Sequence, residues 1–405
     1  MEVSERLFSF IETHAADDLS QLLLSAGRYP EVDVRFAVEQ IASRRHLRGK
    51  LPTWEADGRL LFPSRRAAEQ CSSEFTARYK QRLLEGERHL CDLTGGLGVD
   101  AYYFSLRTEG VTYVECDGAC FETAMYNFER LKAGNITGYN ADARAVSGEI
   151  ARPDVFYLDP SRRVTGNTRV FALRDCTPDL TEMLPCLLRR APKVIAKLSP
   201  MLDVRHALDV LPATCEIHVV SVRNECKELL FVMRSGAKRG DDMPVQCINF
   251  TADGGEQVFR FCLREEREAE SRICRRVQAW LYEPNASILK AGAYKLIAQR
   301  YGVEKLHASS HLYTSDDCLH AFPGRVFRVE GVFAFNNAFC RTIVRDVPQA
   351  NLSVRNFPLT AGELRKRLRI ADGGDVFMFA TTLAAGNEKV VILCRKAERV
   401  SVRAD

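Results

Sequence analysis

The sequence lacks a long apolar run, a paired-cysteine motif and a secretion signal. No stretch approaches about 18 uncharged apolar residues, so we expect no membrane-spanning helix. The first residues, MEVSERLFSFIETHAADD, carry acids where a signal peptide needs basic residues followed by an apolar core. The 14 cysteines are scattered singly and form no CxxC, which argues against a zinc ribbon or a thioredoxin-type site. We therefore predict buried thiols in a reducing cytoplasm, and no metal.

The composition indicates a globular protein of several domains. The chain has 405 residues, 46% of them hydrophobic and 27% charged, which suggests two to four ordinary domains. Residues 341–405 contain 12 Lys or Arg and 7 Asp or Glu, an excess of +5, whereas the whole chain has a net charge of only +4. A basic terminal module favours an acidic partner such as nucleic acid. An ordinary solvated surface explains the same charge equally well.

Residues 1–85 read as a helical region. The stretch Asp33-Val-Arg-Phe-Ala-Val-Glu-Gln-Ile41 places apolar residues three and four positions apart, and no strand-like alternation competes with it. A second helical run is expected over residues 65–84.

Residues 86–240 predict a doubly wound α/β domain. Seven short apolar runs are expected as strands, at residues 89–93, 111–115, 136–140, 155–158, 194–198, 217–222 and 229–233. Helical segments separate the first five of these runs. Helical crossovers require parallel strands. The last two runs are too close for a crossover helix, so they should be antiparallel. The expected sheet therefore has seven strands.

Small α/β modules are expected after residue 240. Residues 241–282 should form a hairpin, with strands at 246–250 and 258–263, and a charged linking helix over 264–281. In the module at residues 283–332, Asn285 can cap a helix running to about residue 300. The module at 333–405 should have a βαββ-like order, in which Thr360 opens a helix with capping-box spacing.

The strongest local motif is Cys91-Asp-Leu-Thr-Gly-Gly-Leu-Gly-Val-Asp100, directly after the first expected strand. Glycines between a strand and a helix let the backbone approach a ligand closely. The segment Gly96-Leu-Gly98-Val-Asp-Ala101 also satisfies the GxGxxA pattern of dinucleotide sites. A tight turn can require these glycines for structural reasons alone, so the motif needs context.

Acidic residues supply that context, because one follows each of the first four parallel strands. Asp92 precedes two of the glycines by four and six residues, and Glu115 closes the second strand, where an acid can accept ribose hydroxyl protons. Asp142 follows the third strand, and Asp159-Pro160 follows the fourth. The carboxyl ends of parallel strands meet in one crevice, so these acids should face one ligand site.

With these motifs the chain resembles class I S-adenosylmethionine-dependent methyltransferases, and more narrowly the bacterial subgroup with C-terminal ferredoxin-like and THUMP-like modules. The antiparallel final strand pair matches the seven-stranded sheet of that family. The resemblance covers nearly the whole chain and includes the stretches DLTGGLGVD (92–100), LDPSRR (158–163), NECKELL (224–230), YEPN (282–285), ILKAGA (288–293) and SVRNFP (353–358).

The resemblance implies a role for each matching residue. The methionine part of the cofactor would be held by Asp92, Thr94, Gly95 and Gly96, and Gly98 of the same loop would also bind the cofactor. Glu115 would bind the ribose, and Asp142 with the Ala143 backbone would read the adenine edge. Asp159-Pro160 would face the transferred methyl group and its acceptor, and residues 70–74 would help to cover the cofactor.

The sequence departs from amino-methylating relatives at the fourth strand. Their motif is Asp/Asn-Pro-Pro-aromatic, whereas here Ser161 and Arg162 follow Asp159 and Pro160. A guanidinium can stack on a base or bind a phosphate, so we assign Arg162 to catalysis with Asp159 and Pro160, and Arg162 and Arg163 to substrate binding. Ordinary surface charge is the alternative for this arginine pair.

The sequence therefore predicts a cytoplasmic S-adenosylmethionine-dependent methyltransferase with RNA, a tRNA or rRNA base, as its acceptor. Three alternatives remain. One is a non-catalytic RNA-binding protein that retains the cofactor pocket, and another is a nicotinamide-dependent oxidoreductase. The third is a methyltransferase for a protein or a small molecule. The i,i+4 pair His307 and His311 lacks a carboxylate partner, so we expect no metal there.

Overall fold

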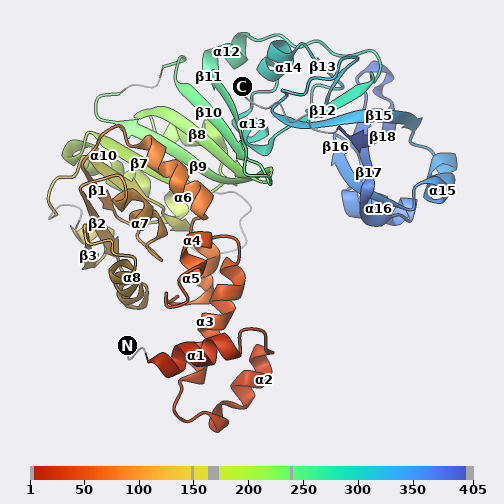
Figure 1. Cartoon of the computed structure of the whole chain (residues 1–405). Coiled ribbons are helices and arrows are strands. Elements are labelled where there is room, and N and C mark those ends of the chain that lie inside the picture. The colour runs from red at the N-terminus through yellow and green to blue at the C-terminus, as the bar shows by residue number, and fades with distance from the viewer. Residues whose placement is uncertain (1–3, 147–149, 163–172, 238–239, 398–405) are drawn as a thin grey trace, which may run out of the picture. The chain divides into compact units, whose positions relative to one another are not determined.

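The computed structural model describes residues 4–146, 150–162, 173–237 and 240–397 (Figure 1). Contacts divide the chain into two compact units. The first consists of residues 1–215 with Glu228–Arg239, and the second of Glu216–Lys227 with residues 240–405. The chain therefore crosses between the units three times.

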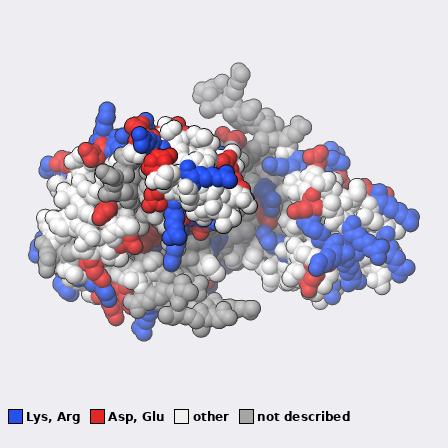
Figure 2. All heavy atoms as spheres, turned by 90° about the horizontal axis from the view of Figure 1, so that it is seen from below, with Lys and Arg blue, Asp and Glu red and all other residues white. Residues whose placement is uncertain are grey.

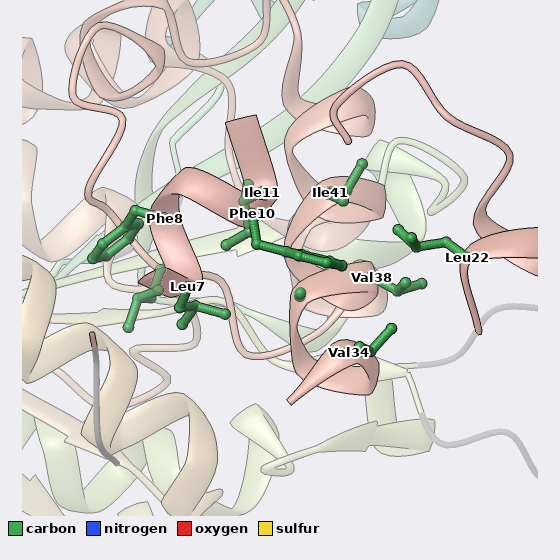
Figure 3. Close-up of a cluster of buried hydrophobic side chains, with 10 residues drawn as sticks. Leu7, Phe8, Phe10, Ile11, Leu22, Val34, Val38 and Ile41 are labelled. Atoms are coloured by element: carbon green, nitrogen blue, oxygen red, sulfur yellow. The ribbon is translucent and has the colours of Figure 1, made fainter. Parts of the chain in front are cut away.

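The N-terminal part of the first unit is helical, as predicted. Its elements are α1 (Glu5–Thr13), α2 (Leu19–Leu24), η1 (Ala26–Arg28), α3 (Val34–Leu47), α4 (Pro52–Glu55), α5 (Arg65–Gln70), α6 (Glu74–Lys80) and η2 (Gln81–Leu83). The apolar residues of α3 line up on one face and pack against α1 and α2 (Figure 3). The run expected over residues 65–84 is interrupted, because Cys71 is extended and the Ser73 side chain caps α6.

Two buried carboxamides hold the segment at Leu61 and Phe62, and the one from Asn127 attaches the helical part to the rest of the unit. Asn127 of α8 bonds both the N–H and the carbonyl of Leu61, at 2.9 and 2.8 Å. Gln40 of α3 bonds the N–H and the carbonyl of Phe62 in the same way. These bonds satisfy backbone groups in a segment that has no ladder of its own.

The remainder of the first unit is α/β. Its strands are β1 (His89–Asp92), β2 (Gly110–Glu115), β3 (Ile136–Asn140), β4 (Val155–Leu158), β7 (Lys193–Leu198) and β9 (Glu225–Arg234), with the short pair β5 (Ser161–Arg162) and β6 (Cys176–Thr177). Its helices are α7 (Val99–Ser105), α8 (Gly118–Arg130), α9 (Ala143–Val146), η3 (Leu173–Asp175), α10 (Leu180–Arg190) and α11 (Val204–Val210). The five strands β3-β2-β1-β4-β7 are parallel, as predicted. Strand β9 is antiparallel to β7.

The sheet has nine strands in the order β11-β10-β8-β9-β7-β4-β1-β2-β3, so the expectation of seven was too low. The hairpin β10 (Pro244–Phe250) and β11 (Glu256–Cys262) was expected, but β10 also pairs in parallel with β8 (Thr214–Val222) and extends the sheet. Between β8 and β9, Arg223 and Asn224 both have positive φ, 52° and 63°. Two such residues form the tight turn that suits a hairpin.

Two helix predictions in the second unit were wrong in extent. The charged helix α12 (Leu263–Glu268) stops early, because the chain becomes extended at Ala269 and Cys274 is buried with its N–H bonded to the Lys305 carbonyl. The helix capped by Asn285 ends at Gly292, which has φ +81°, and is followed by a second helix. These two helices are α13 (Ala286–Ala291) and α14 (Leu296–Tyr301).

A second sheet completes this unit, with seven strands in the order β13-β14-β12-β15-β18-β17-β16. Its elements are β12 (Trp280–Pro284), β13 (Glu304–Lys305), β14 (Tyr313–Ser315), β15 (Gly324–Ala334), α15 (Asn337–Asp346), β16 (Gln349–Arg355), α16 (Ala361–Leu368), β17 (Ala371–Thr382), η4 (Ala385–Asn387) and β18 (Lys389–Lys396). The order β16-α16-β17-β18 is the predicted βαββ arrangement, and Thr360 with Glu363 forms the expected capping box.

Candidate active site

A pocket of about 580 Å³ lies in the first unit, at the carboxyl ends of β1, β2 and β4. Its wall consists of residues 92–97, 99–100, 115–116, 120, 141–144, 159, 161, 177–178, 197 and 199, together with residues 67 and 70–72. The predicted strand-end acids therefore do face one site. Of the predicted cover at residues 70–74, the first three residues line the pocket. Glu74 does not, because its carboxylate bonds Thr53 and Arg78.

The glycine-rich loop is held close to β2. A Cβ atom at Gly95 would lie 2.0 Å from the ring of buried Tyr113, whose hydroxyl donates to the Gly96 carbonyl at 2.5 Å. Gly98 has φ +82°, and a Cβ there would meet Phe128 at 2.5 Å. Gly98 is absent from the pocket wall, so its place in the loop follows from packing and backbone conformation.

Asp92 presents an unpartnered oxygen at the pocket. The residue is 1% exposed, its Oδ1 accepts the Thr94 N–H at 3.0 Å, and its Oδ2 has no hydrogen-bond partner among the described residues. Burial raises the pKa of this carboxyl well above its ordinary value. A buried acceptor without a partner is costly, and a cationic ligand would supply the missing donor.

Glu115 and Asp142 are oriented by backbone amides. The Glu115 carboxylate accepts N–H groups from Gly96 and Asp117, both at 2.7 Å, which fixes its position at the end of β2. Asp142 accepts the Arg144 N–H at 2.8 Å and pairs with the Arg144 guanidinium at 2.7 Å, and this bonding lowers the pKa of Asp142. Ala143 is buried and also lines the pocket.

Asp159 is paired with a cation that the sequence did not bring to attention. The Lys197 ammonium, on β7, donates to Asp159 Oδ2, while the Asp159 N–H donates to Thr94 Oγ1 at 2.6 Å. Pro160 is buried and does not line the pocket. Arg162 is described by its backbone alone, in β5, and Arg163 lies outside the described residues.

A buried charge network lies behind this wall. Lys80 of α6 is fully buried, and its ammonium contacts the carboxylates of Glu228, at 2.9 Å, and Asp100, at 3.1 Å. Asp100 also accepts hydrogen bonds from Ser72, at 2.8 Å, and Tyr157, at 2.7 Å. No local pattern marks Lys80 in the sequence, because the buried residues of α6 also include the polar Glu74 and Thr76.

The charges of the pocket favour a cationic ligand with hydroxyl groups. Five carboxylates line it, from Asp92, Asp100, Glu115, Asp142 and Asp159, against the two cations Arg144 and Lys197. Within the described part of the chain, no group of three or more His, Cys, Asp or Glu side chains is placed to hold a metal ion. The parallel sheet, with an antiparallel strand beyond β7 and acids at its strand ends, is the arrangement that the resemblance to class I methyltransferases implies.

Comparisons with known proteins agree with this class. Residues 280–323 match the model of a ferredoxin-like domain, and residues 324–396 match a THUMP domain-like model. A solved structure from Porphyromonas gingivalis W83, named as a candidate methyltransferase, is 34% identical with a TM-score of 0.86, and the match covers 98% of this chain and 100% of that one. The chain belongs to the class I methyltransferase family, in the bacterial subgroup with ferredoxin-like and THUMP-like domains.

More distant likenesses are partial. An rRNA methylase from Streptococcus thermophilus is 9% identical with a TM-score of 0.30, and the match covers 40% of this chain and 95% of that one. M. capricolum TrmK, solved with S-adenosylhomocysteine, is 10% identical with a TM-score of 0.31, over 41% and 70% of the two chains. At such scores neither bears on the chemistry of this chain. No curated protein matches the sequence.

Two further findings concern membrane spans and disulfides in the described segments. Among the described residues, no helix combines the length and the apolar character that crossing a membrane requires. No disulfide joins any of the 14 cysteines, all of which lie in described segments.

Proposed function

We propose that this protein is an S-adenosylmethionine-dependent methyltransferase acting on an RNA base, in the cytoplasm. The observation that carries the proposal is the pocket in which the unpartnered Asp92 Oδ2 and the fixed Glu115 carboxylate lie at adjacent strand ends. The cytoplasmic location is supported by thiols that lie buried and apart, such as Cys91, Cys247 and Cys394.

The residues present fit the cofactor. Asp92 would bind the ammonium of the cofactor's methionine part, beside the backbone of Gly95 and Gly96. A side chain at Gly95 would overlap Tyr113. Glu115 keeps lone pairs free for two ribose hydroxyls while Gly96 and Asp117 hold it in place. Asp142 and the Ala143 backbone would contact the adenine edge.

The chain's own part in the reaction is to hold and align the partners. When bound, the cofactor supplies a methyl group on a sulfonium, which is already activated for displacement. Asp159 stands at the end of β4, where it would accept the proton that the acceptor nitrogen gives up. Residues 70–72, which line the pocket, would help to keep water from the reacting atoms.

RNA as the acceptor is supported by the THUMP-like module and its charge. Such modules serve tRNA or rRNA enzymes in other proteins. Figure 2 shows Lys and Arg side chains gathered on the part of the molecule that carries α15 and α16. The exposed cations there are Arg341, Arg345, Lys366, Arg367 and Arg369. A cluster of this kind is suited to phosphates.

Calorimetric titration with S-adenosylhomocysteine tests the cofactor pocket. We expect micromolar binding by the wild type and strong weakening in Glu115→Ala. Glu109→Ala should bind as the wild type does, since Glu109 is exposed and lies just before β2, away from the pocket. Absence of binding to well-folded protein would contradict the enzyme assignment and leave an RNA-binding scaffold.

The RNA proposal is tested by charge reversal in α16. The pair Lys366→Glu and Arg369→Glu should weaken binding of bulk tRNA and reduce its salt dependence by about two counterions. Arg205→Glu, at an exposed position of α11, is the matched control. If the double variant bound RNA with the affinity and salt slope of the control, this surface would not be the RNA site.

A further inference from the structure

The pair Asp159 and Lys197 places a cation beside the carboxylate at the end of β4. Register places them side by side, because Leu158 of β4 pairs with Ala196 of β7 and each residue of the pair comes next. Both line the pocket, where the side chains are 33% and 12% exposed. A fixed cation and a fixed carboxylate therefore face the end of the pocket where the acceptor would enter.

The surroundings of Lys197 keep it charged. Burial alone would lower its pKa, but the carboxylates of Asp159, Glu228 and Asp100 raise the pKa of Lys197 above its ordinary value. Asp159 in turn faces Lys197, Asp100 and Lys80, and burial raises the pKa of Asp159. Lys197 is thus a hydrogen-bond donor with a positive charge, and Asp159 is the group able to take a proton.

The sign of that charge selects the acceptor. An exocyclic amine becomes positively charged as it attacks a methyl group, so an ammonium beside it raises the barrier. A ring N–H next to a carbonyl, the lactam edge of guanine or uracil, instead becomes negatively charged when its proton leaves. An ammonium bonded to the carbonyl oxygen stabilises that charge.

We propose that the acceptor is the ring nitrogen of a nucleobase lactam, with Lys197 on its carbonyl oxygen and Asp159 on its N–H. This inference rests on the proposed function. The ring N–H proton passes to the Asp159 carboxylate, and the electron pair left on the nitrogen forms the new N–CH₃ bond. The C–S bond breaks with its pair remaining on sulfur, which becomes a neutral thioether, and Asp159 then releases the proton to water.

Product identity tests the proposal directly. RNA from cells lacking this protein is incubated with the wild-type protein and methyl-labelled S-adenosylmethionine, and its nucleosides are resolved by mass spectrometry. Label in 1-methylguanosine or 3-methyluridine is the expected result. Label on an amine of adenine, cytosine or guanine would overturn the lactam inference while leaving the proposed function intact. Label in no RNA, despite cofactor binding, would instead overturn the RNA acceptor.

A variant series tests the role of Lys197. Lys197→Met should bind S-adenosylhomocysteine as the wild type does, but lose on the order of 10²–10³-fold in rate at neutral pH. Its rate should recover as pH rises, because the lactam then loses its proton to solvent. Lys197→Arg keeps the cation and should retain a substantial rate, and Lys227→Met, at an exposed lysine, is the control. A rate loss in Lys197→Met that is independent of pH would refute the charge argument.

Discussion

Replacing Lys80 by methionine should destabilise the first unit by more than any surface substitution. The ammonium is fully buried between the carboxylates of Glu228 and Asp100, whose side chains are 4% and 9% exposed. Methionine nearly conserves the volume, so a loss of stability cannot be assigned to a cavity. What changes is that two buried carboxylates lose their shared cation.

Removing one partner of a buried ion pair costs about 3–5 kcal/mol, because the other charge remains desolvated. For a unit of this size that corresponds to a fall in melting temperature of roughly 6–20 °C. Glu228→Gln in the Lys80→Met background should restore part of the loss, since it removes one uncompensated charge. Lys227→Met breaks only an exposed pair with Glu225 and should cost less than about 1 kcal/mol.

The pH dependence gives an independent check. Burial alone would raise the pKa of Asp100, but Lys80 and Lys197 lower it below its ordinary value. In the wild type this contribution to stability is present above the ordinary carboxyl range and is lost as pH falls through the lowered pKa. In Lys80→Met the pKa of Asp100 should rise, because the variant lacks the ammonium that lowers it. Protonation of Asp100 then removes its uncompensated charge, so the stability difference between variant and wild type should shrink at acid pH.

Urea unfolding measures these differences; with Trp280 of the second unit replaced by Phe in every variant, the fluorescence of buried Trp54 reports on the first unit. A loss below about 1 kcal/mol in Lys80→Met would refute the reasoning, since it would mean that the carboxylates are solvated or already protonated. A loss that did not diminish at acid pH would refute it as well.

Three further predictions concern the loop, the pocket and the second unit. Gly95→Ala should lower the melting temperature and abolish S-adenosylhomocysteine binding, because its Cβ would overlap Tyr113, whereas Gly134→Ala has open space and should change neither. Asp92→Asn should be at least as stable as the wild type, because burial raises the pKa of Asp92 and disfavours its charge, but it should lose S-adenosylhomocysteine binding. In the wild type that binding should weaken as pH falls, and the weakening should begin at a pH above the usual carboxyl range. Glu283→Gln, 1% exposed and paired with two arginines, should cost about 1–3 kcal/mol in unfolding of the second unit and leave binding intact.

The main features of the sheet and the pocket could be predicted from the sequence for a topological reason. Parallel strands joined by crossovers bring their carboxyl ends to one edge, so an acid after each strand identifies the site without knowledge of side-chain contacts. Asp92, Glu115, Asp142 and Asp159 were located in this way, and the structure brings all four to one pocket.

The features that the sequence did not predict depend on contacts distant along the chain. Lys80 meets Glu228 across 148 residues, and Lys197 meets Asp159 across 38. The pairing of β10 with β8 is also set by the edge of a folded sheet. The charged run at residues 264–281 looked helical, but tertiary packing of Cys274 decides its conformation. Local pattern carries no information on such partners.

The threefold crossing of the chain between units has a consequence for synthesis on the ribosome. Because β9 and Glu228 follow a segment that belongs to the second unit, the first unit is still incomplete when its first 215 residues have emerged. Until β9 has emerged, Lys80 lacks its partner Glu228, and β7 lacks its antiparallel neighbour. The nascent N-terminal portion must therefore wait, with an open sheet edge, for a strand made later, which makes it a natural client for a chaperone.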